Sequence, residues 1–176
     1  MQEIVIATKN EGKVAEFKVL MEQLGLEFKC LKDFPEIEQP VETGKTFAAN
    51  ARLKAQYYAK ATGAICLADD SGLEVLSLKG APGVYSARYA GEEATAEDNN
   101  ALLLKNMRMQ TRRNCRFCCA LAVANPQGKI ILESSGICEG LLLHEPKGEA
   151  TMEEKNGVSH RAKAIKKLCS QWRKMK

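Results

Sequence analysis

The feature that most constrains the fold is the order of patterns over residues 4–31. Ile4 to Ala7 form a short continuous apolar run, which is typical of a central strand buried on both faces. Apolar residues then recur at helical spacing between Gly12 and Gly25, and residues 26–31 indicate a second strand. Because a strand, a helix and a strand in succession favour a parallel strand pair, the chain is predicted to be an α/β protein.

The middle of the chain predicts a second helix and a third strand. The helix is expected from Thr46 to Ala61, with Gly63 ending it. The strand is expected over residues 64–68, and it should end where Asp69 and Asp70 begin. Thr95 followed by Asp98 resembles a capping box, which predicts another helix as far as about Met107.

The remaining third predicts strands and one last helix. Residues 116–124 and 129–134 flank the turn at 125–128 and indicate a hairpin, and residues 136–144 indicate one more strand. Ser159 is expected to cap a final helix that reaches Arg173. With 176 residues and no linker, the chain is predicted to form a single unit over 1–176, either one sizeable domain or two intimate lobes, but not two independent domains.

Composition excludes several classes of function. The net charge of +4 is spread along the chain, whereas a nucleic-acid binder usually has a dense basic stripe. The N-terminus has no leader pattern, and no apolar run reaches roughly 18 residues, so we expect a cytoplasmic protein without a membrane partner. Cys115 and Cys118 form a C-x-x-C motif, but a buried strand explains them better than a metal or redox site does.

Three polar segments are candidates for a functional site. Asp69 and Asp70 follow a buried strand, where carboxylates are costly unless cations or donors accompany them. Asp70 could act as a general base or bind Mg²⁺, and Glu42 could share that ion. The alternative is that both aspartates only cap the following turn.

The turn between the first strand and the first helix is the second candidate. Its backbone N–H groups and two lysines would suit a phosphate chain, although an ordinary connection explains it equally well. Lys155, His160 and Arg161 bracket the start of the last helix, where the helix dipole disfavours cations, so a ligand could supply an anion there. Plain solvation of these side chains is the alternative. The residues of the turn are Thr8, Lys9, Asn10, Glu11, Gly12 and Lys13.

Taken together, these motifs resemble the inosine-triphosphate pyrophosphatase family over nearly the whole chain. The matching segments are residues 7–13, 42–51, 68–73, 80–91 and 155–161. The resemblance implies an elongated mixed β-sheet with two lobes, helices on its sides and a central nucleotide cleft. It also implies a homodimer, and hydrolysis of noncanonical purine triphosphates (ITP, dITP, XTP) to the monophosphate and pyrophosphate with Mg²⁺.

The resemblance assigns roles to individual residues. Asp70 would be the general base or a metal ligand, with Glu42 as its metal partner. The opening turn would hold the phosphates, and the base would lie near the start of the last helix. The residues carried over as substrate-binding are Thr8, Lys9, Asn10, Glu11, Gly12, Lys13, Lys54, Ser71, Arg88, Lys155, His160 and Arg161.

The sequence departs from the family pattern in two places. A Gly-Phe-Gly-Tyr-Asp-Pro segment, whose aromatic ring stacks on the base, is missing, because Pro146 leads directly to Lys155 through a short polar stretch. Ala49 stands where bacterial relatives usually carry a glutamate. The alternatives are therefore an enzyme with relaxed base choice, or a nucleotide-binding variant with weak catalysis.

Overall fold

The computed structural model describes residues 4–22, 27–146 and 159–174. Its centre is a five-stranded mixed sheet in the order β2-β1-β3-β4-β5. β1 is parallel to β2, as the opening of the sequence predicts, and it is also parallel to β3, while β3, β4 and β5 are antiparallel neighbours. The strands are β1 (Ile4–Ile6), β2 (Phe28–Cys30), β3 (Ile65–Val75), β4 (Asn114–Ala124) and β5 (Ile130–Leu141).

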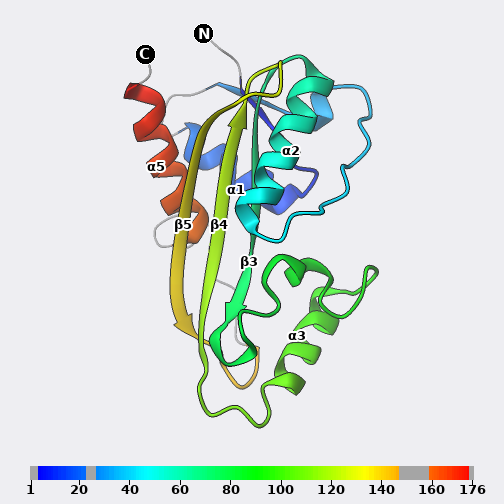
Figure 1. The fold of residues 1–176 in the computed structure, drawn as a ribbon, viewed down its shortest axis with the longest axis vertical. Helices are drawn as coiled ribbons and strands as arrows, with labels where there is room; N and C mark the ends of the chain where they lie inside the picture. The colour runs from blue at the N-terminus through cyan, green and yellow to red at the C-terminus, as the bar shows by residue number, and fades with distance from the viewer. Residues whose placement is uncertain (1–3, 23–26, 147–158, 175–176) are drawn as a thin grey trace.

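Helices cover both faces of the sheet (Figure 1). α2 (Phe47–Thr62) packs on one face, with Ala51, Ala55 and Tyr58 in the core that it shares with Val5. α1 (Glu11–Glu22) and α5 (His160–Lys174) pack on the other face. The α/β class and the mixed sheet predicted from the sequence are confirmed.

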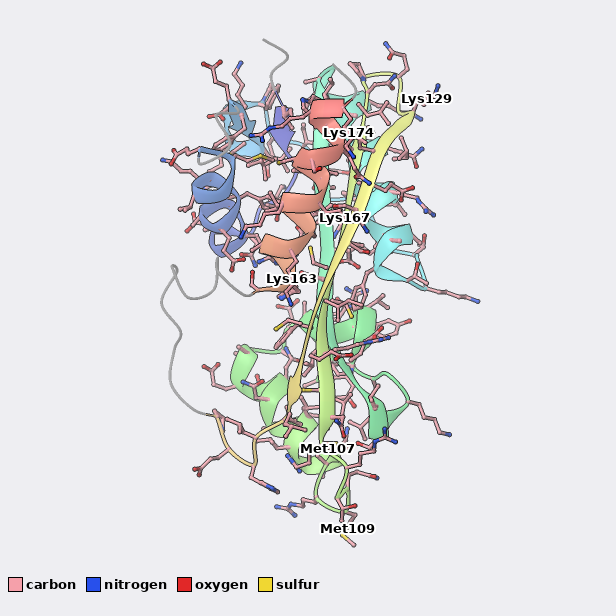
Figure 2. All side chains as sticks on the ribbon, turned by 90° about the vertical axis from the view of Figure 1, so that its left-hand side faces the viewer. Met107, Met109, Lys129, Lys163, Lys167 and Lys174 are labelled. Atoms are coloured by element: carbon pink, nitrogen blue, oxygen red, sulfur yellow. The ribbon has the colours of Figure 1, made fainter. Side chains whose placement is uncertain are left out.

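The residues of α5 explain why this helix forms and which of its sides faces the sheet. Ser159 Oγ accepts the backbone N–H of Ala162, which confirms the predicted cap. Ile165, Leu168 and Trp172 recur at helical spacing and are buried against the sheet. Lys163 and Lys167, labelled in Figure 2, are exposed on this helix, and Lys163 Nζ donates a hydrogen bond to the backbone oxygen of Ile137 on β5.

β3 and β4 are long enough to connect two lobes. They pair along almost their whole length, from Cys66 with Ala124 to Val75 with Cys115. Beyond the main core, α3 (Ala96–Asn106) packs on the far half of β3, where Leu73, Val75, Leu103 and Met107 form a smaller core. Figure 1 shows this second lobe below the helices that cover the upper sheet.

The structure corrects two predicted boundaries. β3 does not end at Ala68 but continues through Asp69 and Asp70, which are both buried. We expected the strand to end there because buried carboxylates are costly, but cations from three helices offset that cost, as described below. Residues 130–141 form one strand rather than two, because Ser135 and Gly136 keep the ladder with Ala120 and Cys119.

Among the described residues, strand β4 separates the two side chains of the C-x-x-C motif. Cys115 and Cys118 are free and lie an odd number of residues apart on β4, so their side chains point to opposite faces of the sheet. The expected strand is confirmed, but it is buried only from Cys118 onward, whereas residues 114–117 are exposed or half-buried. In the described ranges, no helix has the length and apolar character needed to cross a bilayer.

Candidate active site

Asp69 and Asp70 are neighbours on β3, so their side chains point to opposite faces of the sheet. Asp70 faces α2, while Asp69 faces α1 and α5. The two carboxylates are thus built into separate sets of contacts although they are adjacent in sequence. These two sets define the site.

Asp70 is held by two side chains from α2. Lys54 Nζ lies 3.1 Å from Asp70 Oδ1, and Asn50 Nδ2 donates a hydrogen bond of 3.1 Å to Oδ2. Lys54 Nζ also lies 2.7 Å from Glu42 Oε1. The oxygen of the buried Asn50 amide accepts the backbone N–H of Gly44 at 2.7 Å. Asn50 therefore fixes the loop that carries Glu42 against the strand that carries Asp70.

The surroundings of Asp70 favour its protonation more than water does. Burial raises the pKa of its carboxyl group above the usual value of 3.8. Lys54 opposes this shift, but Glu42 adds to it, and the net direction is upward. Asp70 is therefore a carboxylate that can accept a proton more readily than a carboxylate in water.

Asp69 is in the opposite situation. Its Oδ2 lies 3.0 Å from Lys13 Nζ of α1 and 3.4 Å from Arg161 Nη2 of α5. Arg161, itself buried, also forms an ion pair with Glu16 and donates to Ser71 Oγ at 3.1 Å. Asp69 therefore contacts two helices. One is α1, which follows the turn expected to hold the phosphates, and the other is α5, whose start is expected to lie near the base.

The cations around Asp69 keep it ionised. Burial alone would raise its pKa, but Lys13 and Arg161 outweigh burial and hold the pKa below 3.8. Two adjacent aspartates therefore have pKa values displaced in opposite directions. Such a divergence is typical of sites where one carboxylate transfers protons and the other remains a fixed charge.

The opening turn presents its polar groups next to these carboxylates. Asn10 Oδ1 accepts the backbone N–H of Lys13 at 3.0 Å and so caps α1, and Thr8 Oγ1 accepts the N–H of Asn10 at 3.2 Å. Lys13 is thereby directed at Asp69. Glu11 is turned away, with its exposed carboxylate paired to Lys32.

A cavity of about 810 Å³ brings most of the predicted site residues together. Arg88, which lies 3.8 Å from Glu42, forms part of its wall. Glu11 and Gly12 are not part of the lining. The predicted residues that do line this cavity are Thr8, Lys9, Asn10, Lys13, Glu42, Lys54, Asp70, Ser71 and Arg88.

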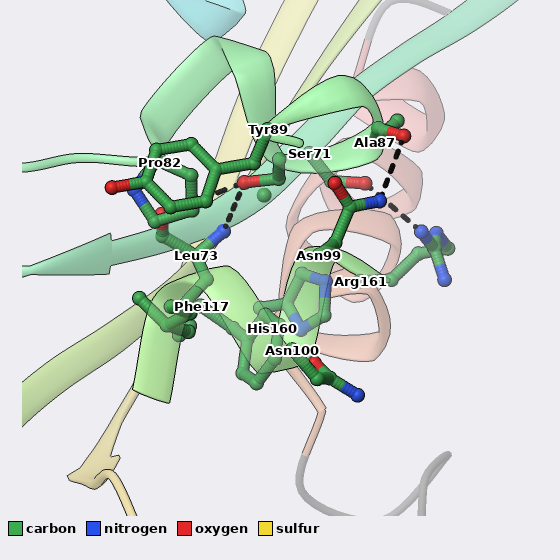
Figure 3. Close-up of a pocket in the computed structure, with 13 residues that line it drawn as sticks. Ser71, Leu73, Pro82, Ala87, Tyr89, Asn99, Asn100, Phe117, His160 and Arg161 are labelled. Carbon is green, nitrogen blue, oxygen red and sulfur yellow. Dashed lines mark hydrogen bonds between the residues drawn. The ribbon is translucent and has the colours of Figure 1, made fainter. Parts of the chain in front are cut away.

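His160 and Arg161 line a second cavity of about 360 Å³, shown in Figure 3. Ser71 and Ala87 belong to the linings of both cavities, so the two are adjacent. Burial, and then the charge of Arg161, lowers the pKa of His160 to about 4. The imidazole is therefore neutral at physiological pH.

Some residues predicted for the site lie outside the described residues, and two residues that make contacts in the site were not predicted. Lys155 and residues 147–154, where the stacking segment is predicted to be missing, lie outside the described residues. Asn50 and Glu16 carry contacts that sequence reasoning did not assign. Glu16 lies three residues after Lys13 on α1, and only the tertiary packing of α5 brings Arg161 to it.

The contacts of Glu42 and Asp70 indicate whether these two carboxylates are suited to bind Mg²⁺. Both carboxylates approach the same cationic atom, Lys54 Nζ, so a positive charge already lies between them. Carboxylate oxygens are the ligands that Mg²⁺ prefers, and these two residues fit such an ion. Among the described residues, however, no group of three acidic, histidine or cysteine side chains is arranged to hold a metal.

Comparisons with known proteins agree with this geometry. The model of the Ham1 family matches residues 4–152. The chain is 44% identical over 191 positions to the dITP/XTP pyrophosphatase of Bacillus anthracis, covering 96% of this chain and 95% of that protein. It is 45% identical over 194 positions to the dITP/XTP pyrophosphatase of Geobacillus kaustophilus, covering 98% and 95%.

Both alignments are longer than this chain, so each of these relatives carries residues that the chain lacks. Among solved structures, the HAM1 protein from Coxiella burnetii superimposes with a TM-score of 0.87 at 35% identity, covering 99% of this chain and 100% of that one. The Staphylococcus aureus Ham1 protein gives a TM-score of 0.87 at 33% identity, with the same coverage.

Proposed function

Because the chain belongs to the Ham1 family, we propose that it hydrolyses noncanonical purine nucleoside triphosphates such as dITP and XTP to the monophosphate and pyrophosphate. One observation carries this proposal. A single cavity is lined by four residues of the opening turn, Lys13 among them, and also by Glu42, Lys54 and Asp70. We further propose, from the family resemblance, that the protein acts with Mg²⁺ and as a homodimer in the cytoplasm.

The cationic side chains along the cavity would bind the triphosphate. Lys13, Lys54 and Arg88 line it, and their charges would offset those of the phosphate oxygens. Glu42 and Asp70 would hold Mg²⁺, which neutralises phosphate charge when it is bound. Lys54 would then contact the phosphates as well as these two carboxylates.

Asp70 supplies the proton acceptor. As a water oxygen bonds to phosphorus, the anhydride bond between the α and β phosphates breaks, and the proton of the water passes to the Asp70 carboxylate. Asp69 does not accept the proton, because Lys13 and Arg161 keep it ionised.

The second cavity is the site proposed for the base. Arg161 and the neutral His160 present N–H donors along its wall. The 6-keto oxygen of hypoxanthine or xanthine accepts hydrogen bonds, whereas the 6-amino group of adenine does not. A donor left without a partner would therefore count against adenine nucleotides.

A release assay tests the proposed function. With Mg²⁺ present, pyrophosphate release from dITP and XTP should exceed release from dATP by about 10²-fold or more in kcat/KM. Equal rates on all nucleotides would indicate an enzyme with relaxed base choice. The absence of turnover, with dITP still raising Tm, would indicate a protein that only binds nucleotides.

Gly136 provides a second prediction, about the position of α5. A Cβ atom at this residue would lie 2.1 Å from the carbonyl oxygen of His160 and 2.7 Å from the backbone nitrogen of Ala164. Gly136→Ala should therefore displace the start of α5, and kcat/KM for dITP should fall about 10²-fold, the effect of a shift of roughly 1 Å in a positioning group.

Gly140→Ala is the matched control for this prediction. It lies on the same strand, and a Cβ atom there would have no neighbour within 4 Å. We expect its kcat/KM to equal that of the wild-type protein. Equal kinetics for the two variants would show that contact between α5 and β5 does not position the site.

A further inference from the structure

Phe117 is an exposed aromatic side chain on a strand whose following residues are buried. The sequence predicts a buried strand over residues 115–123, but the Phe117 side chain is 48% exposed. It lines the 360 Å³ cavity and also a neighbouring cavity of about 410 Å³ that extends along Leu141 and Leu142. The ring therefore lies where the two cavities meet, with apolar surface open to a ligand.

The Phe117 ring is held in place by His160. The two rings are stacked, with centroids 5.3 Å apart and an angle of 18° between their planes. Figure 3 shows them together at the cavity. This separation lies in the range that aromatic pairs prefer. His160 is neutral at physiological pH, so the pair forms a flat surface without net charge.

This flat surface adjoins the cavity proposed for the triphosphate. Ser71 and Ala87 line both that cavity and the one containing Phe117. A nucleotide whose phosphates lie near Lys13 can therefore extend its base past Ser71 toward the two rings. Leu73 and Leu103 complete an apolar wall around them. Such surroundings suit a planar heterocycle better than they suit a sugar or a charged group.

We propose that Phe117, backed by His160, is the platform on which the purine base of the substrate stacks, and that Phe117 is a specificity-determining residue. The inference rests on the proposed function, because it needs a purine nucleotide in the adjoining cavity. Stacking depends on the overlap of π-faces, so a bicyclic purine gains more from this ring than a pyrimidine does.

Kinetics of Phe117 variants test the proposal. Phe117→Leu should raise KM for dITP about tenfold, while kcat stays within about twofold, because leucine fills the space without a π-face. Phe117→Trp should restore KM. Tyr57→Leu is the control, since Tyr57 is 39% exposed on α2 and its ring packs on Tyr58. This control should leave KM unchanged.

Two further measurements separate base stacking from structural damage. Inorganic tripolyphosphate has no base, so its inhibition constant should be the same for Phe117→Leu and for wild type. In Phe117→Trp the added indole should be quenched by dITP without Mg²⁺ but not by tripolyphosphate, and wild type, which has only the buried Trp172, gives the background.

The outcomes distinguish the two proposals. If the wild-type protein does not hydrolyse dITP, the proposed function fails. If the wild-type protein hydrolyses dITP but Phe117→Leu keeps its KM, or if dITP does not quench the indole, the stacking platform is refuted and the proposed function stands. A Phe117→Leu variant with a higher inhibition constant for tripolyphosphate would also overturn the platform, because the loss would not be specific to the base.

Discussion

Replacing Asp70 with asparagine is expected to lower kcat for dITP hydrolysis by roughly 10²- to 10⁴-fold, the range of a lost general base. Asparagine has nearly the same shape but cannot accept the proton of the attacking water. The amide oxygen would replace Oδ1 and still accept from Lys54, which also keeps Glu42 as an ionic partner, whereas Asn50 Nδ2 would lose its acceptor at Oδ2. The loss should therefore be mainly in turnover and only slightly in stability.

Stability gives this prediction its control. Because burial raises the pKa of Asp70 in the folded protein, its charged form costs free energy of folding at neutral pH. The neutral amide removes that cost, which offsets the hydrogen bond that Asn50 loses, so Tm of Asp70→Asn should stay close to the wild-type Tm. Asp98→Asn, which changes an exposed aspartate at the start of α3, should keep full turnover. Normal turnover in Asp70→Asn would refute the proposed mechanism.

Asp69→Asn is expected to have the opposite effect, a loss of stability. Its carboxylate offsets the charges of Lys13 and of the buried Arg161. Removing one partner of a buried ion pair leaves the other charge uncompensated, and we expect the free energy of unfolding to fall by about 3 kcal/mol. In a chain of this size that corresponds to a Tm lower by about 6–12 °C.

The pH dependence of this loss has a definite sign. The folded protein holds the pKa of Asp69 below 3.8, so the carboxylate stabilises the fold above that pH. The difference in Tm between wild type and Asp69→Asn should be full at neutral pH and should shrink as the pH falls through the folded pKa. A calorimetric series from pH 7 downward measures it.

Glu133→Gln is the matched control for the stability prediction. Glu133 pairs with Arg52 at the surface, where both side chains are largely solvated. Exposed ion pairs contribute little to stability, so its Tm should stay close to wild type at every pH. If Asp69→Asn were as stable as Glu133→Gln at neutral pH, the structural role of Asp69 would be wrong.

Sequence patterns predicted the local structure where the signal is itself local. Thr95 caps α3 and Ser159 caps α5, because each side-chain oxygen accepts a nearby backbone N–H within the same turn. The parallel pairing of β1 with β2 follows from the order of strand, helix and strand. These features depend on residues only a few positions apart, or on the chirality of the crossover.

Features that depend on distant partners could not be predicted in the same way. The strand was expected to end before Asp69 because its compensating cations, Lys13 and Arg161, are 56 and 92 residues away in the chain. Phe117 was expected to be buried because its neighbours are apolar, whereas its exposure results from the place of β4 beside a cavity. The contact of Asn50 with Gly44 likewise appears only in the folded chain.

The family resemblance located most of the residues around the proposed triphosphate cavity, but it could not give their contacts. It paired Glu42 with Asp70, and the structure shows Lys54 Nζ lying between their oxygens. It also included Glu11, which pairs with Lys32 outside the cavity. Which residues touch the substrate therefore remains a prediction.

The central claim is that one cavity holds the triphosphate between the opening turn and Asp70. The most direct measurement is a crystal structure of the protein with Mg²⁺ and an α,β-imido analogue of dITP, which cannot be hydrolysed at that bond. We predict that the triphosphate contacts Lys13 and that the ion is bound by Glu42 and Asp70. A triphosphate bound outside the cavity, or an ion that touches neither carboxylate, would contradict the claim.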